Sequence, residues 1–134
     1  MTSVTNVANV PSADLFLRRA ILADAVLSGA TGLLMIAGAG FLADLLAIPA
    51  TLLLAAGLTL APYVAFVVYV GTRPNIPRGG VSLIVGANAV WTIASIILLV
   101  AGLILPNLLG YAFVIGQAVV VALLGELQYI GLRR

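Results

Sequence analysis

The sequence contains no cysteine and no histidine, and because all six of its basic residues are arginine, it contains no lysine either. Without cysteine there are no disulfide bonds, thiol catalysts or iron–sulfur ligands, and without either residue type the zinc sites that they build are excluded. The missing histidine also excludes a Ser-His-Asp triad. We therefore expect a protein that is not an enzyme and that binds no metal or cofactor.

Charged residues are scarce as well: they make up 7% of the 134 residues, whereas 63% are hydrophobic, and the mean hydropathy is +1.27. About a quarter of a soluble domain is charged, so lipid must surround most of this chain. Lipid leaves only helices or a closed barrel, and apolar runs of about twenty residues without strand-like alternation favour helices. The composition predicts an all-α integral membrane protein.

Four apolar runs predict transmembrane helices at about residues 15–40, 50–71, 81–105 and 108–130, which form a single domain over residues 12–134. Residues 1–11 are small and polar, and they predict a flexible cytoplasmic tail. Residues 41–48 form a short amphipathic link that carries Asp44, and Pro62 predicts a kink in the second span. The expected fold is a four-helix transmembrane bundle.

The arginines flank the predicted spans at the start of the first, between the second and third, and at the end of the fourth: Arg18, Arg19, Arg73, Arg78, Arg133 and Arg134. With four crossings, all of them fall on one side of the membrane. Cytoplasmic loops are enriched in arginine and lysine, so both termini are predicted to lie in the cytoplasm, with the chain in the inner (plasma) membrane. Because the arginines lie at helix ends rather than in a patch with exposed aromatics, we expect no nucleic-acid partner.

The two halves of the sequence resemble one another. The first and third spans carry polar residues at positions i, i+4 and i+7, on one helical face: Asp24, Ser28 and Thr31, and sixty-four positions later Asn88, Thr92 and Ser95. The second and fourth spans end in Tyr, a branched aliphatic residue, Gly, any residue and Arg, at residues 69–73 and 129–133. This pattern predicts two tandem helical hairpins, related as a parallel internal repeat. Chance similarity in a chain rich in Leu, Ala, Val and Gly is the alternative.

Three spans place a polar side chain at a similar depth near the predicted cytoplasmic side. Asp24 lies about 7 Å beyond Arg19, and Glu126 lies about 10 Å before Arg133, at about 1.5 Å per residue. Asn88 enters the third span to a similar depth. Because charges inside a membrane are costly, these side chains should face the bundle interior or reach back to water. With their neighbours they define a candidate intramembrane polar layer: Asp24, Ser28, Asn88, Thr92, Glu126 and Gln117.

The polar layer has two interpretations. In the structural one, which we favour because arginines lie within reach, Asp24 pairs with Asn88 or Arg19, Glu126 pairs with a C-terminal arginine, and the layer fixes helix register. In the functional one, Asp24 is a proton- or cation-responsive group with Asn88 and Ser28 as partners. Gln117 lies deeper and is expected to bond a carbonyl such as that of Leu58, which Pro62 leaves without its helical donor. The side chains of Tyr63 and Trp91 are interpreted as packing or interface residues.

The leading function is therefore a small multi-pass membrane protein that acts by helix packing, as a subunit or stabiliser of a membrane assembly. Its expected partners are the lipid bilayer and either further copies of the chain or other membrane subunits. The alternative is a small proton- or cation-coupled transporter or channel that uses Asp24. In size and span number the chain is similar to small multidrug-resistance transporters, but their first helix carries a Glu in a different local pattern, so we do not assign it to that family.

Overall fold

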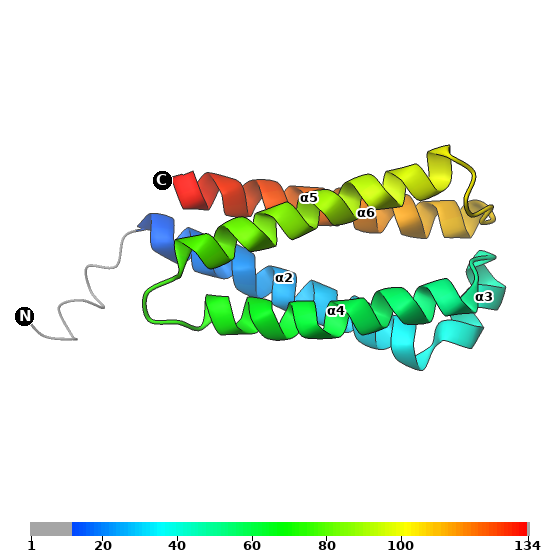
Figure 1. The fold of residues 1–134 in the computed structure, drawn as a ribbon, viewed down its shortest axis with the longest axis horizontal. Coiled ribbons are helices and arrows are strands. Elements are labelled where there is room, and N and C mark those ends of the chain that lie inside the picture. The colour runs from blue at the N-terminus through cyan, green and yellow to red at the C-terminus, as the bar shows by residue number, and fades with distance from the viewer. Residues whose placement is uncertain (1–11, 134) are drawn as a thin grey trace, which may run out of the picture.

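The computed structural model describes residues 12–133, which form one short and four long α-helices. They are α2 (Ser12–Ala37), α3 (Ala39–Leu46), α4 (Ala50–Gly71), α5 (Arg78–Val100) and α6 (Leu108–Arg133) (Figure 1). The predicted tail at residues 1–11 and Arg134 lie outside the described residues. The four long helices are each long and apolar enough to cross a membrane, which confirms the expected all-helical fold with four candidate spans.

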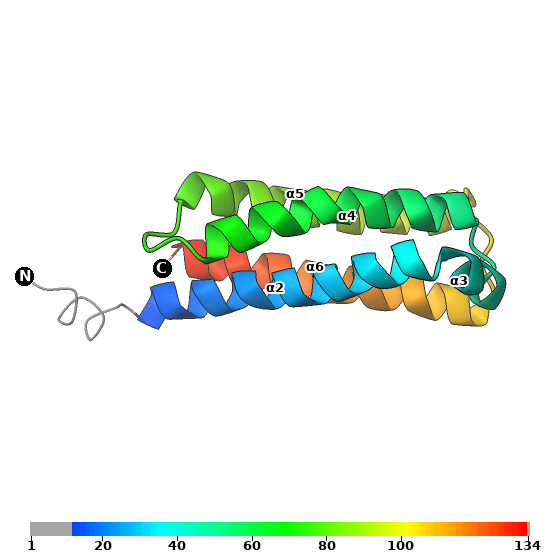
Figure 2. The same cartoon turned by 90° about the horizontal axis from the view of Figure 1, so that it is seen from below.

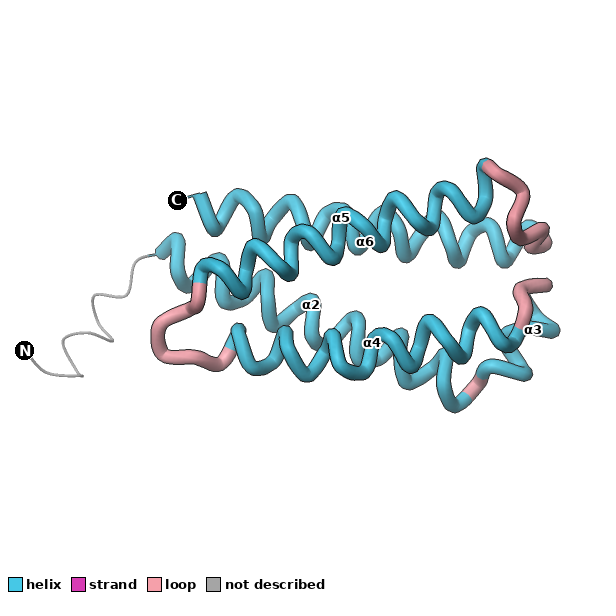
Figure 3. The backbone as a smooth tube through the Cα atoms, in the orientation of Figure 1, coloured by secondary structure: helices cyan, strands magenta, loops and turns pink. Residues whose placement is uncertain are grey.

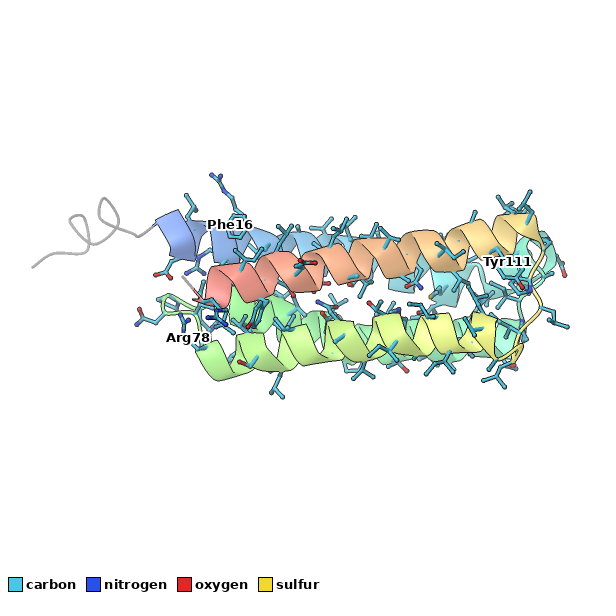
Figure 4. The ribbon with its side chains drawn as sticks, turned by 90° about the horizontal axis from the view of Figure 1, so that it is seen from above. Phe16, Arg78 and Tyr111 are labelled. Atoms are coloured by element: carbon cyan, nitrogen blue, oxygen red, sulfur yellow. The ribbon has the colours of Figure 1, made fainter. Side chains whose placement is uncertain are left out.

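The four long helices pair as two hairpins. Helix α2 packs along α4 and α5 packs along α6, and α2 also lies against α6, whereas α4 and α5 make little contact. Figures 1 and 2 show these pairs from two directions, with the start of α2, the α4–α5 loop and the end of α6 at the same end of the bundle. We call this the arginine end and the opposite one the α3 end. Figure 4 shows Phe16 and Arg78 at the arginine end and Tyr111 at the α3 end.

The outer surface of the bundle is apolar. Val26, Leu33, Leu83 and Val90, from α2 and α5, are each between 66% and 69% exposed. A water-soluble monomer rarely exposes such continuous apolar surface, whereas lipid solvates it well. The interior holds two apolar clusters, one near the arginine end around Leu17, Ile21 and Val67 and one near the α3 end around Leu46, Leu53 and Ile104.

The loops lie at the two ends of the bundle (Figure 3), and at the α3 end they hold the hairpins together. Asn107, in the α5–α6 loop, donates from its side chain to the Leu45 carbonyl at 2.9 Å and from its backbone to the Leu46 carbonyl at 3.2 Å. Its side-chain oxygen accepts from the Gly110 N–H at 2.8 Å, which caps the first turn of α6. One asparagine therefore joins α3 to the start of α6.

The third span starts and ends earlier than the 81–105 that the sequence predicts. It begins at Arg78 because Pro77 precedes it as the N-cap residue, and it ends at Val100 because Gly102 adopts φ +70°. The N–H groups of Gly102 and Leu103 return to the carbonyls of Leu99 and Leu98, the bonding pattern of a glycine-terminated helix. Apolar residues continue past Gly102, so hydropathy alone placed the helix end too late.

Candidate polar site in the bundle interior

Asp24, on α2, has no solvent-exposed surface and lies between the two apolar clusters. Its Oδ1 accepts a hydrogen bond from the Ser28 hydroxyl at 2.7 Å, one helical turn away. Its Oδ2 accepts from the Tyr63 hydroxyl at 2.6 Å, the Gln128 amide at 2.9 Å and the Asn88 amide at 3.0 Å. Every one of these partners is neutral, so hydrogen bonds rather than a counter-charge compensate for burying the carboxyl group.

All four long helices contribute to this cluster: Asp24 and Ser28 from α2, Tyr63 from α4, Asn88 from α5 and Gln128 from α6. The partners also bond one another. Asn88 donates to the Gln128 side-chain oxygen at 2.9 Å, and its own oxygen lies 2.9 Å from the Tyr63 hydroxyl. Gln128 uses its second N–H on the Ala20 carbonyl at 3.3 Å. Because these bonds span all four helices, a shift of any one helix along its axis would break several of them.

A second polar cluster lies closer to the α3 end. The indole N–H of Trp91 donates to the Gln117 side-chain oxygen at 2.8 Å. Gln117 donates in turn to the Ser95 hydroxyl at 3.0 Å and to the Val114 carbonyl at 2.8 Å, and Ser95 donates to the Trp91 carbonyl at 2.8 Å. This cluster links α5 to α6 only. Gln117 therefore does join helices, but through Ser95 and Trp91 and not through the Leu58 carbonyl that we expected.

The structure brings Asp24, Ser28 and Asn88 together as predicted and leaves Glu126 out. Glu126 is exposed, and Gln128 occupies the place in the layer that the sequence analysis gave to Glu126. Two residues turn an α-helix by about 200°, so the side chains of Glu126 and Gln128 lie on nearly opposite faces of α6. The expected pairing of Asp24 with Asn88 holds, while Arg19 is exposed on the surface of α2.

The remaining predicted site residues have other roles. Thr92 lies beside the cluster, but its hydroxyl donates to the Asn88 carbonyl of its own helix at 2.8 Å. The Arg133 guanidinium does not pair with Glu126; it donates to the Tyr129 hydroxyl at 2.8 Å and lies 5.6 Å from the centre of that ring. Arg73 lies over the Tyr69 ring at 4.5 Å in the same way.

Arg18 has the most specific contacts of the described arginines. Its guanidinium donates to the carbonyls of Gly71 at 2.7 Å, Arg73 at 2.8 Å and Pro74 at 3.2 Å. These carbonyls lie at and just beyond the C-terminal end of α4, where a helix has unpaired acceptors and a partial negative charge. Arg18 therefore fastens the start of α2 to the end of α4, in addition to any role in membrane orientation.

Two members of the cluster, Gln128 and Tyr63, are absent from the predicted polar layer. Gln128 shares a face of α6 with Gly125 and Gly131, three residues to either side, and all three are buried. It also precedes Arg133 by five residues, the same interval that separates Arg19 from Asp24, so depth and helical face together point to Gln128. Tyr63 gives no comparable signal, because an aromatic residue within a span is most often a packing residue.

The heavy atoms of the cluster accommodate two arrangements of protons. With an ionised Asp24, the Tyr63 hydroxyl donates to Asp24 Oδ2. With a protonated Asp24, the carboxyl proton is donated to the Tyr63 oxygen, and the Tyr63 proton is donated to the Asn88 oxygen, which lies 2.9 Å away. The two arrangements differ in the orientation of the Tyr63 hydroxyl group and leave every heavy atom in place.

Two cavities reach the partners of Asp24. One of 220 Å³ lies between α2 and α6 and is lined by Ser28 and Gln117, and one of 450 Å³ lies between α5 and α6 and is lined by Asn88 and Glu126. Asp24 itself is sealed from both by these side chains. Within residues 12–133 no three acidic side chains lie close enough to hold a metal ion. Comparison of the chain with family models, curated proteins and solved structures gives no match.

Proposed function

We propose that this protein acts by helix packing, as a non-enzymatic subunit or stabiliser of a larger assembly in the inner (plasma) membrane. The observation that supports this most is the sealed cluster around Asp24. Its polar groups bond to one another across all four spans, and the carboxyl group has no exposed surface. Such a network rigidifies a bundle and fixes helix register, which suits a packing partner better than an enzyme or a carrier that must open.

The membrane-facing surface supports the same proposal. Gly86 on α5 and Gly116 on α6 are exposed, and a methyl group built on either would meet nothing within 4 Å. Small residues on a lipid-facing surface allow another helix to approach closely. In this proposal the occupant of that surface is a second copy of the chain or a helix of another subunit.

The proposed topology has both termini in the cytoplasm and two hairpins related as a parallel repeat. It is supported by the five described arginines, all of which belong to the arginine end of the bundle. The repeat is supported by the bond between Asp24 and Asn88, which occupy equivalent positions sixty-four residues apart. It is further supported by the matching stacks of Arg73 on Tyr69 and Arg133 on Tyr129.

Purification in a mild detergent, combined with crosslinking in native membranes, tests the packing proposal. We expect a stable complex, either of several copies or with another membrane protein, that Gly86→Leu or Gly116→Leu disrupts. Gly40→Leu is the matched control, because Gly40 also has open space around it but lies on the short helix α3. A lone monomer without any crosslinked neighbour would contradict the proposal.

A proton-coupled transporter that uses Asp24 is the second candidate, favoured by the position of the Tyr63 hydroxyl between Asp24 and Asn88. In this mechanism Asp24 binds the proton, and rotation of the Tyr63 hydroxyl accommodates it. Proton flux into vesicles that contain the purified protein should then be lost in Asp24→Asn and reduced in Tyr63→Phe. Equal flux in wild-type and variant vesicles would remove Asp24 from any transport mechanism.

A further inference from the structure

The two hairpins enclose a cavity of 290 Å³ between α4 and α5, in the half of the bundle near the α3 end. Ile48 and Ile104 lie at its α3 end, and Trp91 and Gln117 lie at the opposite end. Small side chains on the facing helices leave this space open, namely Ala55 and Ala56 on α4 and Ala94 on α5. Its volume is almost twice that of an engineered cavity of about 150 Å³ that binds benzene.

The cavity opens toward the surrounding membrane. Ala55, Thr59 and Ala94 line it and are also exposed on the outer surface, so they mark its mouth between α4 and α5. By contrast, the equivalent pair in the proposed repeat, α2 and α6, packs closely. A molecule dissolved in the membrane can therefore reach the cavity from the side, without crossing the polar cluster around Asp24.

The donors and acceptors that remain free in the lining determine which ligands the cavity can bind. Its lining has four polar side chains, and every hydrogen-bond donor on them already has an acceptor inside the protein. The Thr59 hydroxyl donates to the Ala55 carbonyl, and the Ser95 hydroxyl donates to the Trp91 carbonyl. The Trp91 indole donates to the Gln117 oxygen, and the Gln117 amide donates to the Ser95 hydroxyl and the Val114 carbonyl. What remains are acceptor lone pairs on the oxygens of these hydroxyl and amide groups. The lining carries no charged side chain.

We infer that this cavity is a binding site for a neutral lipophilic phenol or alcohol. The apolar body of the ligand fills the space between α4 and α5, and its hydroxyl group donates to the Gln117 or Ser95 oxygen beside Trp91. An ionised ligand is excluded because its charge would be buried without a partner. A ligand that can only accept hydrogen bonds finds no free donor in the lining. This site is separate from the polar cluster around Asp24 and goes beyond the packing function proposed above.

Trp91 provides a direct measurement, because it is the single tryptophan of the chain and lies on the cavity wall. The probes are 4-bromophenol, which is neutral at pH 7 and donates a hydrogen bond, and 4-bromoanisole, in which a methyl group replaces the donated proton. Bromine quenches tryptophan fluorescence on contact. For the purified full-length protein in lipid nanodiscs, with each probe expressed as its concentration in the lipid, we expect saturable quenching that needs roughly fivefold less bromophenol than bromoanisole, as for one hydrogen bond gained.

Matched variants of α5 locate the site. Ala94→Leu fills the mouth of the cavity and should abolish the preference for bromophenol, whereas Ala87→Leu, seven residues away on the same helical face and outside the lining, should leave it unchanged. Bromoanisole partitions more strongly into lipid, so the two probes are compared at equal concentration in the lipid, where quenching from the membrane alone would be equal. Equal or stronger quenching by bromoanisole in the wild-type protein would overturn the inference and assign the cavity to lipid tails. Because that comparison uses only the wild-type protein, it does not depend on whether a variant folds.

Discussion

The Asp24 carboxyl group is surrounded by hydrogen-bond donors, and this determines which side chains can replace it. In Asp24→Asn, the new oxygen can take the position of Oδ2 and accept from Tyr63, Asn88 and Gln128, while the new amide donates to the Ser28 oxygen. We expect its stability to lie within about 1 kcal/mol of wild type, because single hydrogen bonds inside membrane bundles are worth little. Asp24→Leu leaves the Ser28, Asn88 and Gln128 donors without their acceptor and should cost about 3 kcal/mol or more. Thermal unfolding in detergent measures both, and similar losses in the two variants would contradict this account.

Gln128 and Glu126 give a second comparison, within one helix. Gln128→Leu leaves an Asn88 N–H without its acceptor and removes a donor from Asp24, so we expect a loss of about 1–3 kcal/mol. Glu126→Leu replaces an exposed carboxyl group on a membrane-facing surface with an apolar side chain, and it should leave stability unchanged or raise it. Denaturant titrations of both variants in the same detergent make the comparison. A greater loss in Glu126→Leu would place Glu126, not Gln128, in the structural layer.

These residues also show how far the sequence predicts the site. The spacing of Asp24, Ser28 and Asn88 was sufficient to bring them together, because helical periodicity and depth are both readable from a sequence. The predicted layer includes Glu126 and omits Gln128, although the buried glycines of α6 mark the face of Gln128. The bond between Tyr63 and Asp24 cannot be predicted from the sequence, because the Tyr63 hydroxyl reaches Asp24 only as a result of how α4 packs against α2.

At the scale of the helices, Arg18 and Arg19 are adjacent in the sequence but differ in their contacts. Arg18→Met removes three hydrogen bonds to carbonyls at the end of α4 while keeping an apolar stem, and we expect a loss of about 1 kcal/mol in stability. Arg19→Met lowers the charge equally, but Arg19 is exposed and should contribute little. Hydrogen exchange at residues 71–73 is the sharpest measurement, because Arg18→Met should speed it and Arg19→Met should not. Equal exchange in both variants would mean that Arg18 does not fasten this end of α4.

The α2–α4 contact depends on the absence of a side chain at Gly57. A methyl group there would lie 2.8 Å from Ile36 Cγ1 and 3.0 Å from the Gly32 carbonyl oxygen, so Gly57→Ala must push the two helices apart. We expect it to destabilise the bundle by about 1–3 kcal/mol. Gly86→Ala is the control, since its methyl group meets nothing within 4 Å and alanine favours a helix over glycine. If Gly86→Ala proved as harmful as Gly57→Ala in thermal unfolding, close packing between α2 and α4 would not explain the loss of stability in Gly57→Ala.

At the scale of the whole molecule, the most important feature is that the two hairpins depart from twofold symmetry. A repeat of two hairpins would make the α4–α5 contact resemble the α2–α6 contact. Instead α2 and α6 pack closely, while α4 and α5 diverge toward the α3 end. The cavity beside Trp91 fills the space that this divergence leaves between α4 and α5. The polar cluster lies where the four helices still meet. The bundle thus differs along its length: the four helices meet at the polar cluster around Asp24, and α4 and α5 separate toward the α3 end, where the cavity beside Trp91 opens to the membrane.

The absence of cysteine makes the proposed topology directly testable, because a single introduced cysteine is the only reactive thiol. Asn75 in the α4–α5 loop and Asp44 on α3 are exposed and lie at opposite ends of the bundle. On intact cells, a membrane-impermeant maleimide should label Asp44→Cys at once. It should label Asn75→Cys and Arg133→Cys only after the membrane is permeabilised, because arginine-rich segments are retained in the cytoplasm. Labelling of Asn75→Cys and Arg133→Cys from opposite sides would contradict a four-span chain, and labelling of both from outside would invert the orientation while leaving the fold intact.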